Sequence, residues 1–231
     1  METFNIKNHA LNDSAQHGNM DIQLYHFYHL WVGGTRWRET VTDHFNIVRR
    51  YGLLDHLKGL YVGIVGPQNI REEAKKYLNE LDLKHIIVVE ADTGYEQVTQ
   101  NLLYNFSLTH DGYVLYAHNK GSFHDHLFNH AWRISMSYHN IVKWKDAIEH
   151  LSNVDAVGCH WLTPQEFPTL VKSPFFGGTF WWTHLSHIKA LGPPGNDSRY
   201  DAESWIGLLP DMKVYDLCPG WPAGNLFTTM W

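Results

Sequence analysis

The sequence alternates short, β-prone apolar runs with longer amphipathic runs, and this alternation constrains the fold more than any other feature. Such a pattern is typical of βα units that build a largely parallel sheet flanked by helices. With 231 residues, 44% of them hydrophobic, the chain can bury a substantial core, so we expect an α/β fold. The expected strands are Ile22–Val32, Leu60–Val65, His85–Val89, Tyr113–Ala117, Ala156–Trp161 and Met212–Leu217, and the expected helices are Trp37–Tyr51, Arg71–Leu81, Tyr95–Leu108 and, continuous or broken, about Leu127–Leu151.

Charge and cysteine content narrow the setting in which the chain works. Lys and Arg number 18 against 24 Asp and Glu, and this net charge of −6 lacks the basic bias of a dedicated nucleic-acid binder. The two cysteines, Cys159 and Cys218, fit a reduced compartment, with a single bridge left open. No apolar stretch approaches the roughly 18 residues of a membrane span, and the polar segment 1–21 lacks a signal peptide's apolar core. We therefore expect a cytoplasmic protein without a membrane span.

A polar turn follows the expected strand Tyr113–Ala117 and is the first candidate site, because open α/β sheets bind ligands at the carboxyl ends of their strands. It reads HNKGS. Lys120 could neutralise a diphosphate, the backbone at Gly121 could approach phosphate oxygens, and His118 could donate a hydrogen bond or ligate a metal. Arg133 and Arg36 are further cations that could reach a phosphate, although each could equally be a surface residue. The alternative is a solvated turn without a ligand.

The second half of the chain is rich in glycine and tryptophan and offers a second pair of candidates. In FFGGTFWW, Gly177 and Gly178 let the backbone pass close to a ligand, and exposed tryptophan faces would stack on sugar rings. The alternative is a buried aromatic strand with a glycine bulge. In RYDAESWIG, a partly desolvated Glu203 near Asp201 suits a general base, whereas its alternative is a solvated acid at a helix start.

Five segments occur in an order that resembles a group of small bacterial and virus-encoded glycosyltransferases of the GT-A type. They read VLYAHNKGS, WRISMSYHNIVKW, DAVGCHW, FGGTFWWTHLSHIKAL and RYDAESWIGLL, and the similarity covers about Leu24–Leu209. The polar composition of the opening segment predicts an arm over 1–21, and the resemblance implies one GT-A-like domain over 22–231. In that domain a Rossmann-like nucleotide-sugar half, 22–162, is fused to a loop-rich acceptor half, 163–231.

The resemblance also implies an activity and a set of site residues. A sugar would move from a UDP-, GDP-, TDP- or CMP-linked donor to a hydroxyl of a glycan, a protein or a modified nucleobase, a nucleic-acid acceptor being the less favoured. Inversion at the anomeric carbon would use Glu203 as general base, with Asp201 beside it. Donor-binding residues would be His29, His118, Asn119, Lys120, Gly121 and Arg133, and acceptor-binding residues Gly177, Gly178, Trp181, Trp182 and Trp205.

One departure from the family bears on metal use. Many GT-A enzymes hold a divalent metal with an Asp-x-Asp at the end of the fourth strand, and the matching place here reads His118-Asn119-Lys120. Because a lysine repels a cation and can itself supply positive charge, we expect no metal ligands and weak or no dependence on Mn²⁺ or Mg²⁺.

Two other classes of function stay open at this point. A metal-dependent hydrolase would use the cluster His124, His126 and His130, whose last two members are four residues apart and share a face if helical. The chain has 17 histidines, however, so close pairs also arise by chance. A non-catalytic carbohydrate-binding domain would use the tryptophan-rich face and bind a glycan without any nucleotide.

Overall fold

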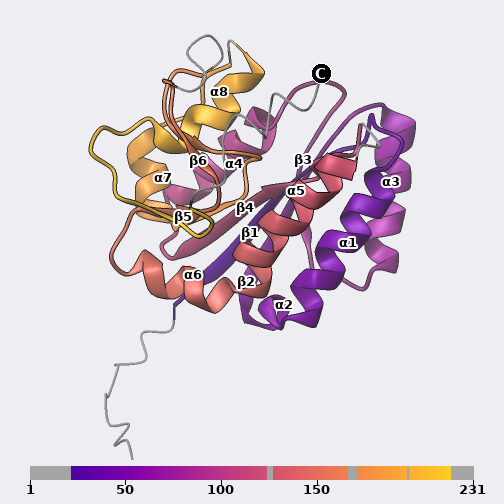
Figure 1. The fold of residues 1–231 in the computed structure, drawn as a ribbon. Helices are drawn as coiled ribbons and strands as arrows, with labels where there is room; N and C mark the ends of the chain where they lie inside the picture. The colour runs from indigo at the N-terminus through magenta and orange to yellow at the C-terminus, as the bar shows by residue number, and fades with distance from the viewer. Residues whose placement is uncertain (1–21, 124–126, 166–170, 197, 220–231) are drawn as a thin grey trace, which may run out of the picture.

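The computed structural model describes residues 22–123, 127–165, 171–196 and 198–219, and these residues form an α/β fold (Figure 1). The strands are β1 (Leu24–Trp31), β2 (Leu57–Val65), β3 (Ile86–Ala91), β4 (Tyr113–His118), β5 (Ala156–Gly158), β6 (Trp161–Leu162), β7 (Phe175–Phe176), β8 (Trp181–His184) and β9 (Val214–Asp216). The helices are α1 (Trp37–Arg50), α2 (Leu53–His56), α3 (Gln68–Glu80), α4 (Gln97–Ser107), α5 (Leu127–Ser137), α6 (Trp144–Leu151), α7 (Leu185–Leu191) and α8 (Arg199–Ser204).

Within the described residues, the main sheet has seven strands in the order β3-β2-β1-β4-β8-β5-β9. Strands β3, β2, β1 and β4 run parallel to one another, and β8 lies antiparallel between β4 and β5. Seven of the eight residues of β1 are buried, as expected for a strand covered on both faces. The predicted fold class, a mostly parallel sheet flanked by helices, is confirmed.

Two apolar cores lie on opposite faces of the sheet. One contains residues of α1, α2, α3, α5 and α6, and the other contains residues of α4, α7 and the turn that follows α8. Figure 1 shows α1 and α5 crossing the near face of the sheet. Because β8 comes from the segment 163–231 and pairs with β4, the two predicted halves share one sheet. The cavity described below lies between elements of both.

Most predicted elements agree with the structure, and two differ in an informative way. The expected strand Ala156–Trp161 ends at Gly158, because His160 adopts a positive φ of 64° and turns the chain away. Trp161 then pairs with Phe176 in a separate two-stranded sheet. The long helical region 127–151 is broken, since a π-helical turn, Tyr138–Val142, separates α5 from α6.

In the part of the chain that the structure describes, no helix is both long and apolar enough to cross a membrane. The predicted polar arm, 1–21, lies outside the described residues. Both cysteines are free thiols; the Cys159 side chain is buried and that of Cys218 is partly exposed.

Candidate functional site

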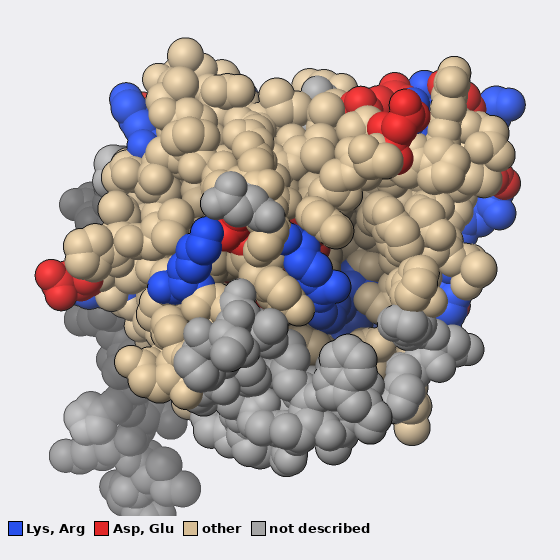
Figure 2. Space-filling view, turned by 90° about the horizontal axis from the view of Figure 1, so that it is seen from above, with Lys and Arg blue, Asp and Glu red and all other residues tan. Residues whose placement is uncertain are grey.

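A cavity of about 360 Å³ opens at the carboxyl ends of β1 and β4, where the polar turn was expected to bind a ligand. Figure 2 shows this end of the molecule, with basic side chains on both sides of a small acidic patch. The wall is formed by His29 and Trp31 at the end of β1, by 94–96 before α4, by the turn 118–123, by Asn129 of α5 and by Arg199 and Glu203 of α8.

Glu203 is the acid that the sequence predicted as general base, and its carboxyl group reaches this cavity from α8. Its side chain is 14% exposed, and Arg199, one helical turn earlier, places Nη2 3.8 Å from Glu203 Oε1. Burial raises the pKa of Glu203 above its ordinary value, and the charge of Glu96 adds to this, whereas Lys120 acts in the opposite direction. A raised pKa suits a group that must accept a proton near neutral pH.

Lys120 also lines the cavity, and its ammonium lies 4.3 Å from the centroid of the Trp132 ring. Burial lowers its pKa, and the carboxylates of Glu203 and Glu96 partly oppose that shift. A partly desolvated ammonium that faces an open cavity is well suited to an anionic ligand, because its attraction is weakly screened there.

Glu96 is a site residue that the sequence reasoning missed. It lies just before α4 and contacts the end of β4, where His118 Nδ1 is 3.0 Å from Glu96 Oε1. The other ring nitrogen of His118, Nε2, lies 2.9 Å from the carbonyl oxygen of Gly178. Burial alone would raise the pKa of Glu96, but the hydrogen bond and charge of His118 outweigh it and hold that pKa well below the ordinary range. The available signal was an acid in the loop between a parallel strand and the next helix, at the carboxyl edge of the sheet.

Two predicted donor-binding residues face the cavity with their polar groups already engaged. His29 Nδ1 lies 2.8 Å from Thr99 Oγ1, and burial lowers the pKa of His29 to about 4, so its ring is neutral at pH 7. The Asn119 amide donates to the carbonyl of Trp31 at 2.7 Å and accepts from the N–H of Trp31 at 2.9 Å. These bonds fix the turn to the end of β1.

Gly121 lies within the turn, and Arg133 of α5 packs against it. Gly121 has a φ of 81°, a conformation that favours glycine, and its missing Cβ leaves room for Asn129 and Arg133. Arg133 is 5% exposed and does not line the cavity. It donates to the Lys120 carbonyl at 3.3 Å and to Asp43 at 2.8 Å, so it holds the turn instead of facing a ligand in this structure.

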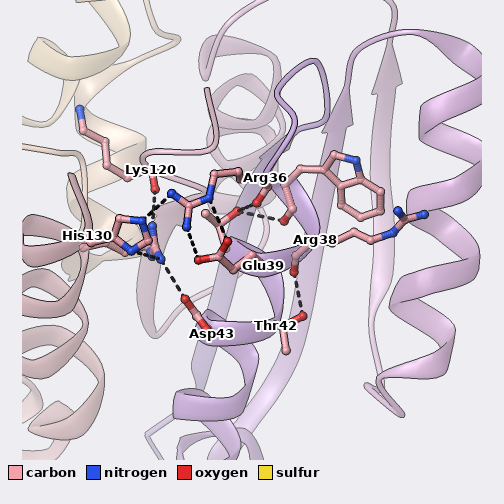
Figure 3. Close-up of polar contacts among 10 residues, drawn as sticks. Arg36, Arg38, Glu39, Thr42, Asp43, Lys120 and His130 are labelled. Atoms are coloured by element: carbon pink, nitrogen blue, oxygen red, sulfur yellow. Dashed lines mark hydrogen bonds and ion pairs between the residues drawn. The ribbon is translucent and has the colours of Figure 1, made fainter. Parts of the chain in front are cut away.

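Figure 3 shows the polar network beneath the turn, with the Lys120 side chain pointing away from it. Arg36 binds Glu39 through its side chain and donates its backbone N–H to Ser122 at 3.2 Å. His130 is hydrogen-bonded to Arg36 in the same network. The start of α1 and the start of α5 are thereby tied to the turn that carries Lys120.

The acceptor residues require a correction. Trp181, Trp182 and Trp205 are at most 1% exposed and lie in the core, so their rings offer no face to a sugar. Their indole groups serve the fold, since Trp182 Nε1 donates to the Asn140 carbonyl at 2.8 Å. The alternative interpretation is confirmed for the buried aromatic strand, whereas its glycine bulge is a turn between β7 and β8.

The two glycines of that turn are confined by their neighbours. Gly178 has a φ of 88°, and a Cβ there would clash with the thioether of Met136. Gly177 is packed against Leu162. Through its carbonyl, Gly178 contacts the cavity wall at His118, whereas neither glycine lines the cavity itself.

Asp201, predicted beside the general base, caps a helix. Its carboxylate accepts from the Ser198 N–H at 2.9 Å in a capping box at the start of α8 and pairs with Lys172 at 3.0 Å. It is 6% exposed and does not line the cavity. Its contribution is therefore to fix the helix that presents Glu203.

The histidine cluster of the hydrolase hypothesis is only partly described. His124 and His126 lie outside the described residues, and His130 belongs to the arginine network beneath the turn. Across the described ranges, no group of three or more His, Cys, Asp or Glu side chains is arranged to hold a metal ion.

A mostly parallel α/β sheet that is flanked by helices and carries a charged cavity at its carboxyl edge defines a Rossmann-like fold. The mannosyltransferase PcManGT from Pyrobaculum calidifontis, solved in complex with GDP-Man and Mn²⁺, shares this fold with a TM-score of 0.53 and 12% sequence identity. The likeness covers 85% of this chain and 56% of that one, so the chain spans little more than half of the mannosyltransferase.

A second solved structure is 4-diphosphocytidyl-2C-methyl-D-erythritol synthase from Anaerococcus prevotii DSM 20548, at 10% identity and a TM-score of 0.48, covering 86% of this chain and 89% of that one. No curated protein matches the sequence. The chain belongs to the family described as domain of unknown function DUF8361, which matches residues 27–204.

Proposed function

We propose that this protein is a glycosyltransferase that moves a sugar from a nucleotide-sugar donor to a hydroxyl acceptor. The observation that carries the proposal is the convergence of Lys120, Arg199 and Glu203 on one cavity at the carboxyl edge of the parallel strands. Its volume of about 360 Å³ falls in the range of small-molecule sites, roughly 300–1,000 Å³. Two cations beside a carboxyl group of raised pKa are the groups that a diphosphate and a reacting hydroxyl need.

In the proposed reaction, the two cations and the carboxyl group have different tasks. Lys120 and Arg199 neutralise the diphosphate, both while the donor is bound and as negative charge grows on the departing nucleoside diphosphate. Glu203 takes the proton of the acceptor hydroxyl as its oxygen attacks the anomeric carbon from the face opposite the leaving group, which inverts that carbon. Because Glu203 must be ionised to act and its pKa is raised, turnover should increase with pH through that raised value.

PcManGT was solved with Mn²⁺, so a divalent cation is the alternative source of positive charge for the donor diphosphate. The described residues around the cavity do not fit a divalent cation. Glu96 is occupied by His118, and Lys120 would repel a metal that approached Glu203. We therefore propose that the two cationic side chains of Lys120 and Arg199 balance the charge of the donor diphosphate.

The proposed acceptor is a hydroxyl group of a glycan, a protein or a modified nucleobase. The net charge of −6 favours the first two over a nucleic acid. We further propose the cytoplasm as the compartment, in keeping with the free thiols of Cys159 and Cys218.

A thermal-shift screen tests the proposal with the full chain. The probes are UDP, GDP, TDP and CMP, together with UDP-glucose, GDP-mannose, TDP-glucose and CMP-sialic acid. A ligand present at 100 times its Kd stabilises the folded state by about 2.7 kcal/mol, which for a chain of this size raises Tm by roughly 5–10 °C.

The controls separate the three classes of function. Free glucose and mannose should leave Tm unchanged, whereas a carbohydrate-binding domain would respond to a free glycan and not to nucleotides. Zinc chloride tests the hydrolase alternative, because a metal-dependent hydrolase would show a higher Tm with zinc and no response to nucleotides. If none of the nucleotides or nucleotide sugars shifts Tm, the transferase proposal is wrong.

A further inference from the structure

Glu96, His118 and Gly178 form a brace across one wall of the cavity. Glu96 comes from the loop between β3 and α4, His118 ends β4, and Gly178 lies in the turn between β7 and β8. The imidazole joins the other two, with 3.0 Å from Nδ1 to the Glu96 carboxylate and 2.9 Å from Nε2 to the Gly178 carbonyl. Three segments far apart in the sequence are thus held through a single ring.

Hydrogen-bond chemistry sets the protonation of that ring. A carbonyl oxygen can only accept, so Nε2 of His118 must carry a proton. An ionised carboxylate also only accepts, so Nδ1 must carry a proton as well. Both ring nitrogens of His118 thus face hydrogen-bond acceptors, a geometry in which an imidazolium donates twice and keeps neither N–H for a phosphate.

The surrounding groups leave Glu96 as the partner that makes this charge favourable. His29 and His44 face the same ring, and burial lowers the pKa of each, His29 to about 4, so both are neutral. Glu203 also acts on His118 across the cavity, but burial raises the pKa of Glu203. The pKa of Glu96 is held well below its ordinary range, so this carboxylate stays ionised beside the ring.

We propose that Glu96 is a positioning residue: it keeps His118 doubly protonated, and the imidazolium anchors the Gly178 carbonyl so that the glycine turn stays fixed against the end of β4. The importance of this contact for catalysis rests on the proposed function, since the glycine turn contacts His118, two residues before Lys120. The charge state itself is a property of the free protein.

The glycine turn depends on such an anchor because its backbone is tightly constrained. Gly178 adopts a φ of 88° and packs against Met136 and Trp132, where no side chain fits. A charge-assisted hydrogen bond is roughly twice as strong as a neutral one. An imidazolium therefore holds this carbonyl more firmly than a neutral ring would.

The variant Glu96→Gln separates charge from shape. A glutamine amide can donate to a neutral His118 at Nδ1 while Nε2 still donates to Gly178, so both contacts survive without any charge. Glu90→Gln is the matched control, because Glu90 is a surface carboxylate at the end of β3 that pairs with Lys75 and Arg71.

The experiment is a long-range ¹H–¹⁵N spectrum of the imidazole groups in the full chain without nucleotide, at pH 7.5. Signals of His118 are identified by their loss in His118→Asn. We expect both ring nitrogens of His118 to be protonated in the wild type and in Glu90→Gln, and Nδ1 to be unprotonated in Glu96→Gln. The amide signals of Gly177, Gly178 and Thr179 should shift in Glu96→Gln and stay in place in Glu90→Gln.

Each contrary result overturns a defined part of the inference. A neutral His118 in the wild type refutes the imidazolium, and this measurement needs no variant to fold. A doubly protonated His118 in Glu96→Gln removes Glu96 as the cause, and unmoved glycine signals remove the anchoring of the turn. A failed nucleotide screen with these spectra as expected would refute the transferase proposal and leave the brace intact.

Discussion

Lys120→Met is the substitution that separates ligand binding from folding most cleanly. Methionine keeps an unbranched side chain only one heavy atom shorter than that of lysine and removes the charge from the cavity. In the proposed function, this removes one charge-assisted contact with the donor diphosphate, a contact of about 1.5–3 kcal/mol. Since about 1.4 kcal/mol is a tenfold change in Kd, binding of the nucleoside diphosphate should weaken by roughly 10- to 150-fold.

Folding should respond much less to the same change. The ammonium lies 4.3 Å from the Trp132 ring centroid, and losing this cation–π contact costs about 0.5–2 kcal/mol. Burial disfavours the charged form of Lys120, as its lowered pKa indicates, so removing the charge offsets that loss. The net effect should stay within about 1 kcal/mol, which is a change in Tm of roughly 2–4 °C or less.

Isothermal titration with the best nucleoside diphosphate, beside a thermal melt without ligand, measures both quantities. Lys143→Met is the matched control, because Lys143 is exposed and lies 5.3 Å from the Tyr138 ring centroid, away from the cavity. The control should bind like the wild type. Unchanged affinity in Lys120→Met, or an equal loss in both variants, would refute a diphosphate contact by Lys120.

Four further outcomes are expected. Glu203→Gln should keep donor affinity within about twofold and lower turnover by roughly 10²-fold or more, and unchanged turnover in steady-state kinetics would make Glu203 structural. Turnover should persist after dialysis against EDTA, and a loss that Mn²⁺ restores would contradict the metal-free balance of charge. Trp205→Phe removes the hydrogen bond from Nε1 to the Gly192 carbonyl, 3.0 Å long, and should cost about 1–3 kcal/mol in urea unfolding while donor affinity stays unchanged. His26 and His29 both have a pKa lowered to about 4 by burial, so the stability that their neutral forms provide is present above about pH 6.5 and lost as pH falls toward 4; a urea series that shows no loss over this range would refute it.

Much of the fold was predictable because its signals are local. The βα alternation predicted the first four strands and their helices, since strand and helix periods are written in neighbouring residues. The stop of α1 was equally local: the helix ends at Arg50, and Gly52 adopts a φ of 73° just beyond it. The error at Ala156–Trp161 came from a non-local cause, because His160 turns the chain so that Trp161 can pair with Phe176.

The site was predictable where it follows from the ends of parallel strands. His118 ends β4 and Lys120 lies two residues further on, so the rule that open sheets bind ligands at carboxyl ends located them. Glu203 was found by its residue type and aromatic setting, and the structure brings it to the same cavity. The prediction for the tryptophans was wrong because residue type alone does not tell whether an aromatic side chain is buried in the core or exposed on a binding face.

By itself, the sequence determined the fold class, the order of the main elements from β1 to α6 and the turn that carries Lys120, because these depend on residues close together in the chain. Only the tertiary structure decided which polar groups face the cavity. It joined Glu96 to His118 and withdrew Arg133, Asp201 and the tryptophans into supporting contacts. The physical reason is that exposure, charge and hydrogen-bond partners are set by packing between segments tens of residues apart, which no local pattern encodes.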